Sequence, residues 1–226
     1  MFEYKFWHHL SHPSQLIHNI ERSEDQRLLG YRRVLLAIFG FTLLFFIIRN
    51  LWGMNTTDLT ALLVNGEGDF YSFARLMSLI GAILAGILFF IIHYYVITYL
   101  IHLLTNIDYG WIRKIQLYVI FFVVLEKLLT VIIFAIAGYS TQFTMFSLAP
   151  MMAYVYYHDY LLFFLNQLTV ASIIAVWIQY IFLSNWTDRP KALLFKLILI
   201  QIVLASLVAL YSILPVLTWI EGWLGL

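Results

Sequence analysis

The chain has 226 residues, of which 63% are hydrophobic and only 11% are charged. A soluble domain has roughly 45–50% apolar and about 25% charged residues, so this composition excludes an ordinary soluble protein and indicates a polytopic membrane protein. The net charge of +1 comes from dispersed basic residues, which argues against a nucleic-acid partner. The absence of cysteine excludes disulfides, thiolate nucleophiles and iron–sulfur ligation.

Residues 1–33 are rich in aromatic and polar side chains and precede the first long apolar stretch. They contain no uninterrupted apolar core and no small-residue cleavage site, so we do not expect a signal peptide. Residues 13–29 predict an amphipathic helix with Leu16, Ile17 and Ile20 on one face. We expect this helix to lie on the cytosolic face of the membrane, and a short cytosolic helix packed on the loops is the alternative.

Five apolar stretches are long enough to cross the ~30 Å hydrocarbon core of a bilayer as helices. They predict an all-α, polytopic integral membrane protein in which residues 34–226 form one transmembrane domain. The predicted spans cover residues 34–50, 76–103, 115–137, 160–183 and 192–214. The second span also contains a series of small residues, which favours close approach by a neighbouring helix. These small residues are Gly81, Ala82, Ala85 and Gly86.

Lysine and arginine residues alternate between the two sides of these spans, and this alternation predicts the orientation. Five of them lie in residues 1–33, two lie between the second and third spans, and two lie between the fourth and fifth spans. The loops on the opposite side offer only Arg49 and Arg75, each at the end of a span. We therefore expect five transmembrane helices, a cytosolic amino terminus and a carboxyl terminus outside.

The third span contains two adjacent charged residues, Glu126 and Lys127, near its middle. Ionisable groups at membrane depth are costly and are functional candidates for that reason. His93 lies at nearly the same depth if the second and third spans form a hairpin centred near Tyr109. We expect Glu126 to turn into the bundle and meet His93 or Thr130. Lys127 would then snorkel or find an acceptor of its own.

Polar side chains within other spans complete the set of candidate site residues. The full set is His93, Glu126, Lys127, Thr130, Asn166, Gln167 and Gln201. Such residues serve either as architectural hydrogen bonds between helices or in a proton- or substrate-linked role, and both interpretations stay open. The sequence predicts no catalytic residue, cofactor or metal site, because it contains no phosphate-binding loop and no HExxH or GxSxG motif.

Three segments carry a resemblance to a known family of membrane proteins. They read FWHHLSHPSQLIHNI near the amino terminus, NIDYGWIRKIQLYVIFFVVLEKLL at the third span, and WIQYIFLSNWTDRPKALLFKLILIQIVL from the fourth span into the fifth. The chain resembles the Ypt-interacting-protein (Yip) family of five-pass membrane proteins. The shared features are aromatics before a helix-opening proline, a glycine-containing link and a lysine–alanine pair that opens the last span.

This resemblance covers nearly the whole chain and implies an all-helical fold with five spans in the orientation given above. Eukaryotic members of the family act in vesicle traffic, bind small GTPases and one another, and carry a long cytosolic amino-terminal region. This chain has only residues 1–33 there, which argues against small-GTPase binding and makes the chain similar to short bacterial members. The implied location is therefore the bacterial plasma membrane.

The leading functional hypothesis is a non-enzymatic membrane protein that acts through contacts with lipids, a membrane-protein partner or a second copy of itself. The alternative is a transporter, a permease component or a lipid-moving protein that uses the polar cluster around Glu126. The sequence shows neither an inverted repeat nor a pair of spans broken by glycine or proline, which weighs against transport. An intramembrane enzyme that uses Glu126 and a neighbouring histidine for acid–base chemistry is a third hypothesis.

Overall fold

The computed structural model describes residues 6–12, 14–15, 17–18, 30–54, 56 and 59–214. Helices account for most of this part of the chain, and the described ranges contain no β-strand. A single isolated bridge in them pairs Ser147 with Thr169. The prediction of an all-α fold is therefore confirmed.

Four helices in the described chain are long and apolar enough to cross a membrane. They are α3 (Tyr31–Leu51), the continuous helix Gly68–Thr105, α7 (Tyr109–Ala137) and α11 (Pro190–Ile213). The second of these consists of α5 (Gly68–Ile91), the π-helix η2 (Ile92–Val96) and α6 (Ile97–Thr105). The shorter helices are α1 (Phe6–Ser11), α4 (Thr60–Val64), α8 (Ala149–Ala153), α9 (Asp159–Leu165), α10 (Val170–Leu183) and η3 (Ser184–Trp186).

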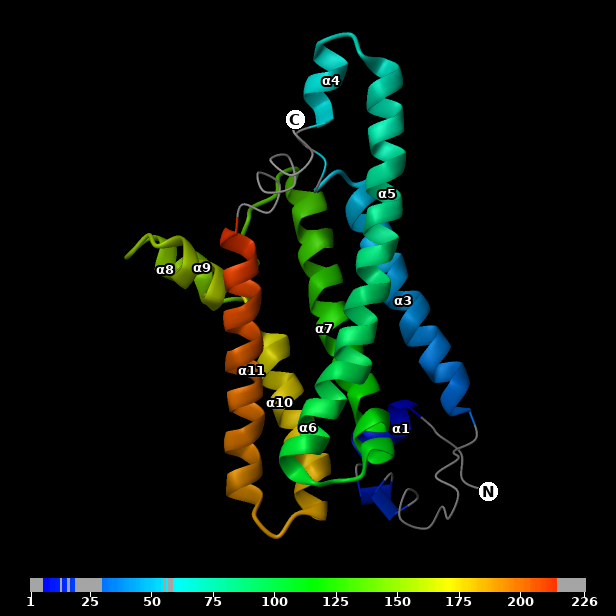
Figure 1. Cartoon of the computed structure of the whole chain (residues 1–226), viewed down its shortest axis with the longest axis vertical. Coiled ribbons are helices and arrows are strands. Elements are labelled where there is room, and N and C mark those ends of the chain that lie inside the picture. The colour runs from blue at the N-terminus through cyan, green and yellow to red at the C-terminus, as the bar shows by residue number, and fades with distance from the viewer. Residues whose placement is uncertain are drawn as a thin grey trace.

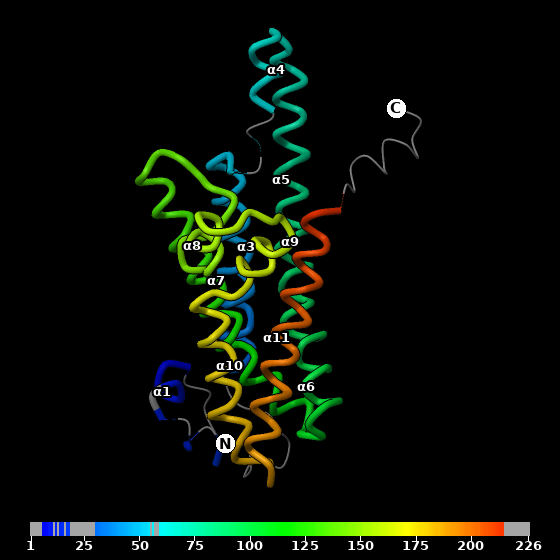
Figure 2. The backbone as a smooth tube through the Cα atoms, turned by 90° about the vertical axis from the view of Figure 1, so that its left-hand side faces the viewer, coloured from blue at the N-terminus to red at the C-terminus, as the bar shows by residue number. Residues whose placement is uncertain are grey.

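Helix α7 is the central element of the bundle. It packs against α10, α3 and α6, while α3 packs against α5 and α10 packs against α11. The long helices run roughly along the long axis of the molecule, as two perpendicular views show (Figure 1 and Figure 2). Their lengths and apolar composition support the prediction of a multi-pass membrane protein.

The fourth predicted span, residues 160–183, is not one continuous helix, and this expectation is corrected. Helix α9 ends at Leu165 and α10 begins at Val170, with a turn between them. Helix α10 has 14 residues. At ~1.5 Å per residue it is about 21 Å long, which is less than the ~30 Å of a hydrocarbon core. Helix α9 leaves the direction of α10 and packs against α11 (Figure 1). Hydropathy did not indicate the break because the segment is apolar on both sides of it.

The second predicted span, residues 76–103, lies within a longer helix than expected. The continuous helix has 38 residues. This corresponds to about 57 Å at ~1.5 Å per residue, so the helix extends well past a ~30 Å hydrocarbon core. Its first turns and α4 project beyond the end of α3 (Figure 1). The π-helical turn η2 carries His93, and such turns within α-helices are frequent at functional sites.

One glycine of the small-residue series in α5 makes the close approach that the sequence predicts. A Cβ atom added at Gly86 would lie 3.0 Å from Leu43 Cδ2 and 3.2 Å from Phe46 Cδ2, both on α3. A Cβ atom added at Gly81 would meet nothing within 4 Å. The contact between α3 and α5 therefore depends on the missing side chain of Gly86 and not on the whole series.

The predicted amphipathic helix at residues 13–29 falls mostly outside the described residues. Helix α1, which precedes it, contacts the bundle through Phe6, whose ring stacks on Tyr118 with 4.4 Å between the centroids. Ile17 is buried in the same apolar cluster as Tyr118. The described part of the amino-terminal segment therefore packs against the transmembrane helices themselves.

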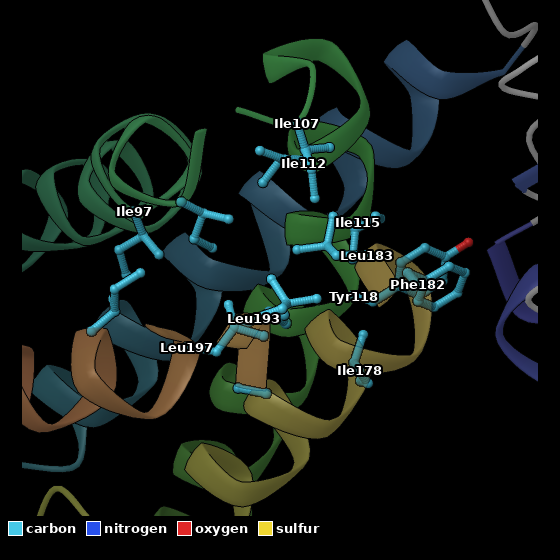
Figure 3. Close-up of a cluster of buried hydrophobic side chains, with 14 of the residues drawn as sticks. Ile97, Ile107, Ile112, Ile115, Tyr118, Ile178, Phe182, Leu183, Leu193 and Leu197 are labelled. Atoms are coloured by element: carbon cyan, nitrogen blue, oxygen red, sulfur yellow. The ribbon is translucent and has the colours of Figure 1, made fainter. Parts of the chain in front are cut away.

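The two halves of α7 differ in how tightly they are packed. Around residues 109–120 lies what we call the packed half, in which every α7 side chain from Ile115 to Ile120 is buried. Figure 3 shows the apolar side chains of α6, α7, α10 and α11 that meet there. Around residues 121–137 lies what we call the cavity half, in which α7 has three buried side chains, Val124, Val131 and Phe134.

Candidate functional site

A cavity of about 460 Å³ occupies the cavity half of the bundle. All seven candidate site residues line this cavity: His93, Glu126, Lys127, Thr130, Asn166, Gln167 and Gln201. They come from η2, α7, the turn between α9 and α10, and α11. The volume falls within the ~300–1,000 Å³ typical of small-molecule sites. The fold thus brings polar residues from distant parts of the sequence to one space.

The turn between α9 and α10 places the first residues of α10 at the cavity. Thr169 caps α10, because its Oγ1 accepts a hydrogen bond from the Ser172 N–H at 3.3 Å. The Ser172 Oγ in turn accepts one from the Thr169 N–H at 3.0 Å. The Val170 N–H donates to the Phe146 carbonyl at 3.2 Å. These contacts satisfy N–H groups that have no intrahelical partner, and so allow a helix to begin inside the bundle.

The carboxylate of Glu126 completes this cap from α7. Its Oε2 accepts a hydrogen bond from the Ala171 N–H at 2.5 Å. The start of a helix carries a partial positive charge of about half an elementary charge, which stabilises a carboxylate there. Glu126 lies about 16 Å from the end of α7 at ~1.5 Å per residue, so the cap sits well inside the length of a helix that is long enough to cross a hydrocarbon core.

The hydrogen bonds of the described residues include neither contact expected for the Glu126 carboxylate, with His93 or with Thr130, so this prediction was wrong. Thr130 Oγ1 donates to the backbone carbonyl of Glu126 at 3.0 Å and not to its side chain. Glu126 pairs with Ala171 instead, because the break in the fourth span offers it a helix start that the sequence did not reveal. The His93 ring lies against Phe89 with 4.2 Å between the centroids. Its buried Nδ1 has no hydrogen-bond partner among the described residues. His93 and Glu126 both line the cavity, but no hydrogen bond joins their side chains.

Lys127 lines the cavity beside Glu126. One residue step rotates the side chain by about 100° around α7, so Lys127 faces a different part of the cavity from Glu126. Within the described chain, no hydrogen-bond acceptor contacts its ammonium group. A desolvated ammonium group is costly unless an acceptor satisfies it. The cavity therefore contains a cation whose acceptor is not among the described residues.

The segment after α7 folds back into the bundle and forms one wall of the cavity. Its Thr144 Oγ1 lies 3.0 Å from Thr130 Oγ1, and its Thr144 N–H donates to Asn166 Oδ1 at 2.9 Å. The same Oδ1 accepts a hydrogen bond from Ser147 Oγ at 3.1 Å. Thr130 and Asn166 therefore hold the returning segment against α7 and against the turn that precedes α10.

The cavity is open toward the end of α7 and closed toward the packed half. Exposed Ser140, Thr141 and Gln142 line its mouth. At the other end, Gln179 Nε2 donates a hydrogen bond to Gln116 Oε1 at 3.0 Å, and both side chains are buried. The NH₂ group of the Gln116 amide has no partner among the described residues. An unmet donor of this kind is unfavourable unless water or a ligand accepts from it.

Sequence reasoning missed the helix start at Val170 and several polar lining residues, among them Arg49 and Gln116. Arg49 was assigned to the end of a span, and Gln116 was not among the candidates. One signal was available: Thr169 and Ser172 have the spacing of a capping box, although serine replaces the usual Glu or Gln. Together with the adjacent Asn166 and Gln167, this spacing indicates a helix start within an otherwise apolar stretch.

The chemistry that the cavity offers is charge and hydrogen bonding. It contains one carboxylate engaged with α10, one ammonium group without an acceptor in the described chain, and several amide and hydroxyl groups. In the described ranges, no group of three His, Cys, Asp or Glu side chains is placed to hold a metal ion. In comparisons with known proteins, no family model, no curated protein and no solved structure matches this chain.

Proposed function

We propose that this protein binds a small polar or charged solute in the cavity, as a transporter or as a permease component. The observation that carries this proposal is the break at residues 166–169, which brings the start of α10 and Glu126 together at membrane depth. Broken helices that expose their ends near the midplane are typical of substrate sites in many secondary transporters. Irregular backbone at this depth is tolerated where it lines a cavity or is buried in protein.

The proposal includes a topology of five crossings. The chain enters α3 at the packed half and leaves α11 at the cavity half, with α10 completing the crossing that residues 138–169 begin (Figure 1). Basic residues gather near the packed half, at Arg113, Lys114 and Lys191 among others. The positive-inside rule therefore favours a cytosolic packed half and a cavity that opens outside. The resemblance to short bacterial Yip proteins favours the bacterial plasma membrane.

A purely architectural role for the polar residues accounts less well for the cavity. Amides in an architectural role pair with one another across helices, as Gln179 Nε2 does with Gln116 Oε1. By contrast, Lys127, Gln167 and Gln201 line the cavity, and their side chains form no hydrogen bond with the described residues. Polar groups that face an open space at membrane depth favour a bound solute or water.

The proposal is tested by asking whether the cavity is reached by water and solute. Because the chain contains no cysteine, Gln201→Cys introduces a single thiol at the cavity wall. We expect a small, membrane-impermeant thiol reagent to modify it in intact membranes, and to do so from one side. The matched control is Val203→Cys on the same helix, since Val203 is 48% exposed on the bundle surface and faces lipid in this topology.

Modification of Gln201→Cys at a rate well above that of Val203→Cys supports a cavity that solutes reach. A thiol at position 201 that is as unreactive as the one at position 203 would overturn the proposed function. Flux of labelled solutes into liposomes that contain the full chain then separates transport from binding alone.

Contact with a membrane-protein partner or a second copy is a second candidate function, favoured by one observation. Apolar side chains are exposed on α4 and the first turns of α5, including Val64 at 86% and Phe70 at 68%. This region projects beyond the end of α3 (Figure 1), so part of it lies outside the expected hydrocarbon core. Exposed apolar surface outside lipid commonly marks an interaction site. Photo-crosslinking from Phe70 in native membranes tests this function, and the absence of any crosslinked product would argue against it.

A further inference from the structure

We propose that the solute in the cavity is a small oxyanion, a molecule with a carboxylate or phosphate group, and that Lys127 holds this group. This inference rests on the proposed function and specifies the class of solute.

The charge balance of the cavity favours an anion. Among the described residues that line it, Glu126 is the only acid, whereas Arg49 and Lys127 are basic. The Glu126 carboxylate already accepts a hydrogen bond from the Ala171 N–H. The negative charge of the carboxylate and the partial positive charge of the helix start therefore largely offset each other. Arg49 has an interaction of its own, whereas the Lys127 ammonium group has no hydrogen-bond partner among the described residues. This ammonium group is the charge that a bound anion would complement.

The Asn166 amide, which lines the same cavity as Lys127, favours the same class of solute. The Oδ1 atom of Asn166 already accepts hydrogen bonds from Thr144 and Ser147. The part of the Asn166 amide that remains available is its NH₂ group, which can only donate. At this amide a metal or ammonium cation, which needs acceptors, would meet a donor. An oxyanion satisfies both this amide and the Lys127 ammonium group.

A second donor without an acceptor among the described residues, the Gln116 amide, lies deeper in the cavity, toward the packed half. Gln116 is 1% exposed, its Oε1 accepts from Gln179, and its Nε2 has no acceptor among the described residues. At ~1.5 Å per residue, Gln116 lies about 16 Å from Lys127 along α7. The Gln116 NH₂ group is therefore a second donor of the cavity wall, toward its closed end.

The size of the cavity favours a polyatomic anion over a halide. Its volume is about 460 Å³. A single water, which is similar in size to a small halide, occupies about 30 Å³ of liquid volume. A halide would leave most of the space to water, whereas a carboxylate- or phosphate-bearing molecule fills more of it and offers several acceptor oxygens.

Thermal unfolding of the purified full chain in detergent tests the inference. The probes are sodium acetate, sodium phosphate, the neutral isostere acetamide and the cation methylammonium, at constant ionic strength. We expect acetate or phosphate to raise the midpoint of unfolding and acetamide and methylammonium to leave it unchanged. The acetate and phosphate arms distinguish a carboxylate solute from a phosphate solute. The dissociation constant derived from the shift should be at least about thirtyfold weaker in Lys127→Met.

The matched variant is Lys127→Arg, which keeps the charge and should keep the anion-dependent shift. Lys127→Gln, which keeps a donor without the charge, takes the place of Lys127→Met if the methionine variant does not yield monodisperse protein. An unchanged anion response in the neutral variants overturns the inference, as does a response to none of the four probes. Stabilisation by acetamide or methylammonium instead of the anions also overturns it, while leaving solute binding intact. Failure of the proposed function itself is seen separately, as an unreactive Gln201→Cys thiol.

Discussion

The two halves of α7 form one continuous helix, but they differ in how closely the rest of the protein packs around them. Residues 121–137 are the more apolar half, yet only three of their side chains are buried. Residues 109–120 contain more polar groups, yet every side chain from Ile115 to Ile120 is buried, including that of Gln116. Hydrophobicity therefore does not indicate which part of a membrane helix is packed against protein, because lipid-facing side chains are equally apolar.

The cause of the difference lies in α10. This helix is 14 residues long and packs against α7, so it covers only part of the length of α7. Figure 2 shows α10 beside the lower part of α7, with α8 and α9 beyond the start of α10. Above that start, polar side chains and the returning segment replace close apolar packing. A break of a few residues in the fourth predicted span thus leaves the cavity beside α7.

The sharpest test of the comparison is to truncate matched isoleucines in the two halves. Ile115 is 1% exposed in the packed half, whereas Ile136 is 83% exposed at the end of α7. We expect Ile115→Ala to lower the free energy of unfolding by about 2–4 kcal/mol, because it leaves a void among tightly packed side chains. Ile136→Ala should change it by less than about 0.5 kcal/mol. The measurement is denaturant-induced unfolding in mixed micelles, and equal losses in the two variants would contradict the distinction between the halves.

The helix start at the cavity is tested by removing its carboxylate. Glu126→Ala leaves the Ala171 N–H without its acceptor, and we expect a loss of about 1–3 kcal/mol in the free energy of unfolding. Glu126→Gln keeps an acceptor without the charge and should lose roughly half as much. Faster amide hydrogen exchange at Ala171 is the local measurement. If exchange there is the same in both variants and in the wild type, Glu126 does not cap α10.

The contact between α3 and α5 is expected to give a smaller effect on stability, and a control position lies on the same helix, α5. We expect Gly86→Leu to destabilise the protein by about 1–2 kcal/mol, because the added side chain meets Leu43 and Phe46 of α3. Gly81→Leu should be neutral or slightly stabilising, since a Cβ atom there meets nothing within 4 Å and glycine costs a helix about 0.5–1 kcal/mol. Thermal unfolding of both variants tests this prediction. A larger loss of stability for Gly81→Leu than for Gly86→Leu would show that α3 and α5 do not make their close contact at Gly86.

The smallest expected effect concerns the boundary between the two halves. Gln116 and Gln179 are hydrogen-bonded to each other at 3.0 Å. A double-mutant cycle on Gln116→Leu and Gln179→Leu should give a coupling energy of about 0.6 kcal/mol, with about 1.7 kcal/mol as an upper value. The readout is the free energy of unfolding in mixed micelles. Strictly additive changes would mean that the pair does not join α7 to α10.

The sequence by itself determined the helical class and the approximate positions of the continuous helices. The predicted last span, residues 192–214, agrees closely with α11, because long apolar runs ended by proline and polar residues have few other solutions. The sequence also identified seven polar residues that line one cavity, since polar groups in an apolar span are conspicuous. These features depend on composition along the chain and need no knowledge of partners.

Only the tertiary structure decided how these residues meet. Glu126 and Ala171 are 45 positions apart, and their hydrogen bond depends on a helix start that apolar flanks conceal. The expected partner, His93, lines the same cavity, but no hydrogen bond joins it to Glu126. Burial along α7 was equally hidden, because similar apolar residues are buried in one half of the helix and mostly not buried in the other. Long-range contacts, and not local hydropathy, therefore created the cavity.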